Sequence, residues 1–118
     1  MSSPTEITPQ QLSRLIGLPD APIVLDVRSD DAFGRDPRLI PTAVRRDARA
    51  VETWGSAYAG RRLVVVCLHG GALSQGAAAW LRQQGAEAAR ASHVANQSLL
   101  MGGARVRWNA AAGRVEKA

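Results

Sequence analysis

Long hydrophobic runs and cysteines are both scarce in this sequence. No apolar run approaches the roughly 20 residues that a membrane-spanning helix needs, and the polar start MSSPTEITPQQ lacks the basic and apolar stretches of a signal peptide. Cys67 is the single cysteine, so we expect a free thiol and a reducing compartment, the cytoplasm. A chain of 118 residues can bury a core as one domain, predicted to span 1–118.

Lysine and aromatic residues are also few. Lys117 is the only lysine, so the net charge of +5 comes almost wholly from arginines, which are spread along the chain among acidic residues. We interpret them mainly as a solvated surface, with a field that steers small anions toward a cleft as the alternative. A nucleic-acid partner is disfavoured because no aromatic platform accompanies the basic residues. No membrane partner is expected, and the sequence leaves the oligomeric state open.

The first half of the chain predicts a helix followed by a buried strand. Thr8, Pro9 and Gln11 are typical of a helix start with a capping box. The short apolar run 23–25 is typical of a strand that is buried on both faces, with Asp26 at its end. Another strand is expected to begin at 43–44.

Helical and strand patterns continue to alternate in the second half. Residues 49–58 have helical spacing, and residues 63–67 are a second apolar run that ends at Cys67. Ser74 is the expected N-cap of a helix that runs to Gln84 and ends at Gly85. The alternation predicts an α/β domain with a mostly parallel sheet and helices on both faces.

The single thiol is expected where an α/β sheet binds its ligands, at the carboxyl end of a strand. The segment 68–73 contains two adjacent glycines that let successive N–H groups turn inward, and a helix N-terminus follows. Such a ring would stabilise the thiolate of Cys67, and His69 would assist if protonated. The alternative is that Cys67 is an ordinary buried small hydrophobe.

Several segments, in order from about residue 6 to 113, resemble those of rhodanese-like sulfurtransferase domains. The matching pieces are the helix start ITPQQL at 7–12, LDVR at 25–28, IPTA at 40–43, the strand–Cys67–loop–helix unit, and LMGG at 100–103 followed by Trp108. The Cys-x-His-Gly loop resembles a bacterial single-domain subgroup that is sometimes associated with chromate resistance.

The resemblance implies a three-layer fold with a five-stranded sheet, and a sulfurtransferase without cofactor or metal. Cys67 would take the sulfane sulfur from an anionic donor such as thiosulfate, form a persulfide, and pass the sulfur to a thiol or cyanide. The implied substrate-binding residues are Leu68, His69, Gly70, Gly71, Ala72, Leu73, Ser74, Asp26 and Arg28. Asp26 and Arg28 would shape the floor of the site, with a structural ion pair as the alternative.

The loop also departs from the family. Family loops have six residues counted from the cysteine and end in Arg or a similar polar residue, whereas the sixth and seventh residues here are Ala72 and Leu73. A loop of seven residues resembles the related cell-cycle phosphatases and arsenate reductases, but these need an Arg to grip the oxyanion. Three functions stay open: a sulfurtransferase, a catalytically weak sulfur carrier, anion sensor or protein-binding module, and a phosphatase or oxyanion reductase.

The segment RASHVANQSLL at 90–100 predicts an altered last strand or a rebuilt loop, or an extra helical turn at 94–101. His93 is expected at the surface, because a metal site of Cys67, His69 and His93 matches no zinc spacing. Trp54, Trp80 and Trp108 are predicted as core residues rather than as a ligand-stacking box.

Overall fold

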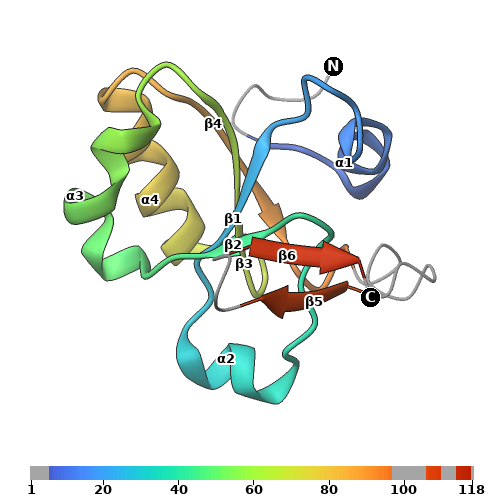
Figure 1. The fold of residues 1–118 in the computed structure, drawn as a ribbon. Coiled ribbons are helices and arrows are strands. Elements are labelled where there is room, and N and C mark those ends of the chain that lie inside the picture. Colours follow the sequence, from blue (N-terminus) through green and yellow to red (C-terminus); the bar gives the residue numbers. More distant parts are fainter. Residues whose placement is uncertain (1–5, 97–105, 110–113, 118) are drawn as a thin grey trace.

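The computed structural model describes residues 6–96, 106–109 and 114–117. The elements in chain order (Figure 1) are α1 (Pro9–Leu15), β1 (Ile23–Asp26), α2 (Asp30–Arg35), β2 (Val44–Arg45), η1 (Ala48–Ala50), α3 (Val51–Trp54), η2 (Gly55–Tyr58), β3 (Arg62–Cys67), α4 (Ala72–Gln83), β4 (Glu87–Ser92), β5 (Val106–Asn109) and β6 (Arg114–Lys117). Strands and helices alternate from α1 to β4, which confirms the predicted α/β class.

The main sheet has four parallel strands in the order β2-β1-β3-β4, and β5 pairs with β6 in a separate antiparallel ribbon. The expected fifth strand of the main sheet is therefore wrong for the described residues. Beyond β4, Glu6 makes a single parallel bridge to Arg90, and the Ile7 N–H donates to the Arg90 carbonyl at 3.1 Å. Thr8 caps α1 immediately afterwards, so the chain turns from this bridge directly into a helix.

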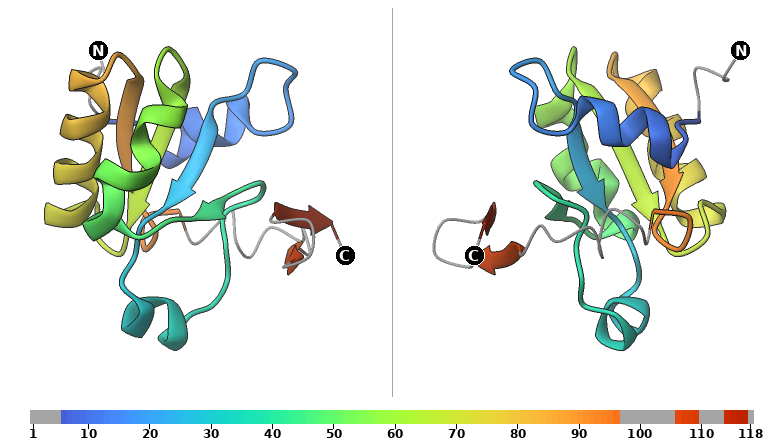
Figure 2. Two further views of the ribbon diagram at one scale, coloured as in Figure 1. Left: turned by 60° about the vertical axis from the view of Figure 1, so that its left-hand side comes forward. Right: turned by 90° about the vertical axis from the view of Figure 1, so that its right-hand side faces the viewer.

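Side chains of β1 and β3 alternate between two cores, because successive residues of a strand point to opposite faces. Leu25 and Val65 face α4 and the α3–η2 segment, whereas Val24 and Val64 face α1. Figure 2 shows α3 and α4 together on one side of the sheet and α1 on the other. The prediction of helices on both faces is confirmed.

The predicted helix signals are confirmed at α1 and at the C-terminus of α4. Thr8 Oγ1 accepts from the Gln11 N–H at 3.2 Å, and Gln11 Oε1 accepts from the Thr8 N–H at 2.9 Å. Gly85 follows the last turn of α4 with φ +94°, the left-handed conformation that glycine adopts without strain. The helical spacing at 49–58 corresponds to η1, α3 and η2.

Trp54 and Trp80 both pack against the core beneath α4, as predicted. Trp54 also donates its indole N–H to the Asp47 carbonyl at 2.8 Å and meets the Tyr58 ring edge-on at 5.8 Å. The Trp108 side chain and the LMGG segment at 100–103 lie outside the described residues, and so does most of the alternative helical turn at 94–101.

The turn that leads into β2 holds a threonine in a conformation that favours glycine. The Ala43 N–H donates to the Ile40 carbonyl at 2.9 Å, and Thr42 has φ +73°. Pro41 fixes a negative φ at the preceding position, so the turn is type II, whose third residue is ordinarily Gly. Ile40 and Ala43 are each 1% exposed, so the buried ends of the turn hold Thr42 in this conformation.

We expect Thr42→Gly to raise the free energy of unfolding by up to about 1.5 kcal/mol. A non-glycine residue in the left-handed region costs roughly 1–2 kcal/mol, from which the chain-entropy cost of glycine, about 0.5–1 kcal/mol, is subtracted. Urea denaturation measures the difference. Thr42→Ala is the matched control, because it keeps a Cβ and so keeps most of the strain. A loss of stability in Thr42→Gly would contradict strain at this turn.

Candidate functional site

Cys67 ends β3 at the carboxyl edge of the sheet, beside the loop that leads into α4. Its residue surface is 5% exposed, and it belongs to the core on the α4 side of the sheet. It is the free cysteine of the chain. Loop residues 68–71 then connect it to α4, whose first residue is Ala72 and whose N-cap is Gly71.

The expected N-cap at Ser74 is wrong, because the N-cap of α4 is Gly71, three residues earlier than predicted. Gly70 has φ +71°, and this turn brings the chain into the helix at Ala72. The Gln75 N–H donates to the Gly71 carbonyl at 2.9 Å as the first helical bond. The apparent loop extension to seven residues therefore disappears, and with it the length argument for a phosphatase.

Two groups contact the sulfur of Cys67. The Gly71 N–H donates to Sγ at 3.0 Å, and the Ser74 hydroxyl oxygen lies 3.1 Å from Sγ. The same hydroxyl lies 3.2 Å from the Gly71 carbonyl, to which it can donate. In the thiol state Sγ–H donates to Ser74, which donates to Gly71. In the thiolate state a rotated Ser74 hydroxyl donates to the sulfur instead.

The sulfur accepts from fewer backbone amides than the ring of inward amides expected for 68–73 would supply. Within the described loop, Gly71 is the one backbone amide that donates to Sγ, and a side-chain hydroxyl is the second contact. Leu68 is held from the other side, because its carbonyl accepts from the Val94 N–H at 3.0 Å and the Ser92 hydroxyl at 3.2 Å. His69, Ala72 and Leu73 are exposed, and Gly70 and Gly71 are half-buried.

A cavity of about 450 Å³ lies beside the loop, between the end of β1, α2, the β2–η1 segment and the first turn of α4. Arg45, Arg46, Arg49, Asp47 and Leu73 are among the residues that line it. The volume is within the range of roughly 300–1,000 Å³ that is typical of small-molecule sites. Leu73 reaches the cavity from the position next to Ser74, so the cavity adjoins the turn that contacts the sulfur.

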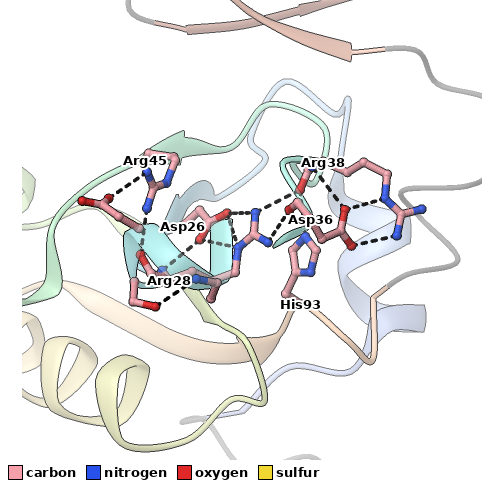
Figure 3. Close-up of polar contacts among 9 residues, drawn as sticks. Asp26, Arg28, Asp36, Arg38, Arg45 and His93 are labelled. Carbon is pink, nitrogen blue, oxygen red and sulfur yellow. Dashed lines mark hydrogen bonds and ion pairs between the residues drawn. The ribbon is translucent and has the colours of Figure 1, made fainter. Parts of the chain in front are cut away.

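Asp26 and Arg28 form a buried ion pair, which corresponds to the structural alternative (Figure 3). Their side chains are 2% and 0% exposed, and Arg28 Nη2 lies 2.8 Å from Asp26 Oδ2. Arg28 Nη1 donates to the Asp36 carbonyl at 2.7 Å and Nη2 donates to the Arg38 carbonyl at 3.0 Å. The Arg28 guanidinium thus links the end of β1 to the segment that follows α2. It is not free to hold a ligand.

Phe33 lies between Arg28 and Arg45. The guanidinium carbon of Arg45 is 4.2 Å from the centre of the Phe33 ring, and that of Arg28 is 5.3 Å away. Arg45 also donates to the Arg28 carbonyl at 2.8 Å and pairs with Asp30 at 3.3 Å. These contacts hold Arg45 in the wall of the cavity.

The expected surface position of His93 is wrong: His93 is 1% exposed. Its backbone N–H donates to the Cys67 carbonyl at 2.8 Å, and its Nε2 lies 2.8 Å from the Arg38 carbonyl. The continuation of the chain from β4 past the end of β3 carries it inward. His93 therefore joins the cysteine strand to the segment that Arg28 also holds (Figure 3).

Asp36 and Arg38 form a more exposed pair at the same connection. The Arg38 guanidinium donates to both Asp36 carboxylate oxygens at 2.7 Å. This side-chain hydrogen bond lowers the pKa of Asp36 to about 2. The pair therefore stays charged throughout the neutral and mildly acidic range.

Two site residues carry no local sequence signal. Arg90 on β4 contacts Gly70 in the cysteine loop, and Arg45 lies in the cavity wall. Both placements depend on the strand order and register, which single-sequence patterns do not specify.

Among residues 6–96, no three histidine, cysteine, aspartate or glutamate side chains are grouped to hold a metal ion. No helix in the part of the chain that the structure describes is long and apolar enough to cross a bilayer.

We expect Arg28→Met to lower the free energy of unfolding by about 3–5 kcal/mol, the usual cost of leaving a buried charge without its partner. Asp26→Asn combined with Arg28→Met should cost less than the two single effects added, because no charge then stays buried alone. Urea denaturation of the singles and the double completes the cycle. Arg38→Met, which breaks the exposed pair, is the matched control and should cost less than about 1 kcal/mol. Equal losses in Arg28→Met and Arg38→Met would contradict the structural role of Arg28.

Comparison with known proteins gives matches to solved structures. No protein-family model and no curated protein matches the chain. The rhodanese-like domain protein of Staphylococcus aureus has 20% identity and a TM-score of 0.65, over 78% of this chain and 90% of its own. SSP1007 of Staphylococcus saprophyticus has 22% identity and a TM-score of 0.61, over 74% of this chain and 85% of its own.

A third match is the single-domain sulfurtransferase RDL2 of Saccharomyces cerevisiae. It has 16% identity and a TM-score of 0.56, over 87% of this chain and 94% of its own. At these identities the likeness is one of architecture. The parallel sheet, the helices on both faces and the strand–Cys67–loop–helix unit together give this chain the rhodanese-like fold.

Proposed function

We propose that this protein is a sulfurtransferase that carries sulfane sulfur as a persulfide on Cys67. The observation that supports it most is the position of the sulfur. Cys67 Sγ accepts the Gly71 N–H at 3.0 Å and lies 3.1 Å from the Ser74 hydroxyl, at the carboxyl end of a central strand. The fold is shared with a yeast protein described as a single-domain sulfurtransferase. A thiol nucleophile also fits a reducing compartment such as the cytoplasm.

In the first step the Cys67 thiolate attacks the sulfane sulfur of the donor. With thiosulfate, a new S–S bond forms on Cys67, the sulfur–sulfur bond of the donor breaks, and sulfite leaves with the electron pair. The product is a persulfide whose terminal sulfur carries one negative charge. A thiolate nucleophile and fixed donors near the developing charge are the groups that this chemistry needs.

In the second step a nucleophile such as cyanide or a thiolate attacks the terminal sulfur. A bond forms between the acceptor and that sulfur, the persulfide bond breaks, and Cys67 leaves as the thiolate. The Gly71 N–H and the Ser74 hydroxyl would stabilise the negative sulfur in both resting forms. No oxidant, metal or cofactor is needed to balance either step.

The cavity beside the loop would hold the donor. The guanidinium of Arg49 has no hydrogen-bond or ion-pair partner among the residues that the structure describes, and that of Arg46 contacts only the carbonyl of its neighbour, at 3.3 Å. Both are thus free to meet an anion. Ala72 occupies the sixth position of the loop, where the resembling family has an arginine or a similar polar residue, so the donor would be held from the β2–η1 side instead.

A sulfur carrier with weak turnover is the second candidate. The cavity contains aspartates as well as arginines, and Asp30, Asp31 and Asp47 offset the positive charge of its wall. A near-neutral wall attracts a small dianion weakly, so the binding of thiosulfate would be poor. A carrier would still accept sulfur on Cys67 and release it to a partner thiol.

Incubation with thiosulfate and cyanide tests the proposal by the thiocyanate formed. We expect turnover that is lost in Cys67→Ala. We also expect a roughly 10- to 100-fold lower rate in Ser74→Ala, because one donor to the charged sulfur is removed. Arg82→Met, which changes an exposed side chain on α4, is the control for unspecific effects and should retain full activity.

Intact-protein mass spectrometry after exposure to thiosulfate separates the alternatives. A gain of one sulfur atom on Cys67 without thiocyanate would favour the carrier. Hydrolysis of an aryl phosphate would favour a phosphatase instead. Thiocyanate formation that persists in Cys67→Ala would overturn the persulfide mechanism.

A further inference from the structure

A single peptide unit joins Arg90 to the sulfur of Cys67. The carbonyl of Gly70 accepts from Arg90 Nη1 at 3.0 Å. The N–H of the same peptide belongs to Gly71 and donates to Cys67 Sγ at 3.0 Å. Because the peptide is planar and its C=O and N–H point in opposite directions, a group that holds the carbonyl also aims the N–H.

The two glycines that flank this peptide do not fix its orientation by themselves. Gly70 has φ +71°, and a Cβ at Gly71 would meet nothing within 4 Å. A peptide between two glycines can flip at little steric cost, because no side chain restricts the flanking torsions. A flip would turn the Gly70 carbonyl toward the sulfur and remove the N–H from it. An external contact is therefore needed to keep the donor in place.

Arg90 is well placed to be this contact. It lies on β4, opposite Val65 of β3 in the parallel register. Its side chain is 24% exposed and also pairs with Glu6, and its carbonyl accepts from the Ile7 N–H at 3.1 Å. The guanidinium is thus anchored on one side by the N-terminal segment and contacts the cysteine loop on the other.

We propose that Arg90 is a positioning residue that keeps the Gly71 N–H on the sulfur and so favours the anionic form of Cys67. The inference rests on the proposed function, because a persulfide carrier needs its sulfur anionic. A cation on the carbonyl draws electron density from the peptide and makes its N–H a stronger donor. Arg90 acts through one peptide and does not touch the reacting sulfur.

Other titratable or charged groups lie on the elements around Cys67. They are His69 on the loop, His93 after β4, Asp26 at the end of β1 and its partner Arg28. Each of them is retained in every variant of the test. A comparison among variants at one position therefore isolates the contribution of Arg90.

Direct titration of the thiolate tests the inference. Because Cys67 is the only cysteine, its ultraviolet thiolate absorbance is the difference between each variant and the same variant carrying Cys67→Ser. We expect Arg90→Met to raise the midpoint pH of thiolate formation, because the N–H that donates to the sulfur is no longer held in place. The midpoint of Arg90→Lys should lie between those of the wild type and Arg90→Met, since lysine keeps the positive charge but lacks the planar guanidinium. Glu6→Gln, which only loosens the anchor, should shift the midpoint slightly in the same direction.

Arg82→Met is the matched control. Arg82 Nη1 donates to the Ala88 carbonyl at 2.8 Å, so this variant also removes a guanidinium from a β4 carbonyl but leaves the cysteine loop untouched. It should leave the midpoint unchanged. A midpoint in Arg90→Met equal to that of Arg82→Met overturns the inference. If Arg90→Met fails to fold, the Lys and Glu6→Gln variants decide: wild-type midpoints in both overturn it.

The titration and the thiocyanate assay fail independently. If Arg90→Met shifts the midpoint but the protein transfers no sulfur, the role of Arg90 stands and the proposed function is overturned. If the protein transfers sulfur but Arg90→Met has the wild-type midpoint, the proposed function stands and the inference is overturned. In an active protein, Arg90→Met should lower kcat about tenfold and change KM less, because the donor cavity lies on the other side of the loop.

Discussion

The pairing of β3 on both sides determines the position of the Cys67 sulfur in the fold. β1 pairs with β3 in parallel register from Ile23 to Asp26, and β4 pairs with it along its whole length, up to Cys67 opposite Ser92. A strand held on both edges cannot slide, because a shift of one residue would send its apolar side chains to the wrong faces. The sulfur is therefore fixed at the carboxyl edge, where the loops of an α/β sheet can form a site.

The neighbouring strands contribute rigidity rather than reactive groups. Arg28 after β1 and His93 after β4 both contact the carbonyl of Arg38, at 3.0 and 2.8 Å. The connection between α2 and β2 is thereby tied to both strands that flank β3. It leads through the strained turn at Thr42 into the segment that carries Arg45, Arg46 and Arg49. The cavity wall is thus built on buried polar contacts, which hold one geometry because each lost partner would leave a buried group unsatisfied.

Sequence patterns predicted the elements and the position of the thiol, because both depend on local signals. The capping box at Thr8 and the apolar run that ends at Cys67 are readable from neighbouring residues. The hydroxyl of Ser74 predicts an N-cap, because serine is one of the residues that cap helices. Once Gly70 and Gly71 close the turn earlier, the same hydroxyl faces the sulfur. The four-stranded sheet of the described residues has a similar cause, since the strong cap at Thr8 ends the pairing with β4 just after Glu6.

Arg90 lay beyond sequence reasoning for a different reason. It contacts Gly70 across 20 residues and Glu6 across 84, and only the strand order brings the three together. The burial of His93 has the same origin, because its place depends on where β4 ends relative to β3. Nothing in the composition of RASHVANQS distinguishes an inward histidine from an exposed one.

The contacts of the sulfur also bear on which anion the site suits. One amide and one hydroxyl can neutralise part of a single charge, as on a thiolate or persulfide sulfur. A phosphoryl or arsenate group spreads its charge over several oxygens and needs a fork of donors around it. The side chain of Leu73 has no hydrogen-bond donor, and the guanidinium of Arg28 already binds Asp26 and two backbone carbonyls. Arg46 and Arg49 lie in the cavity wall, where they would meet the donor's outer atoms rather than its transferred sulfur. The site would therefore have two weak donors at the sulfur and cationic side chains farther out. This arrangement suits the transfer of a sulfur atom to an acceptor better than the hydrolysis of a phosphoryl group.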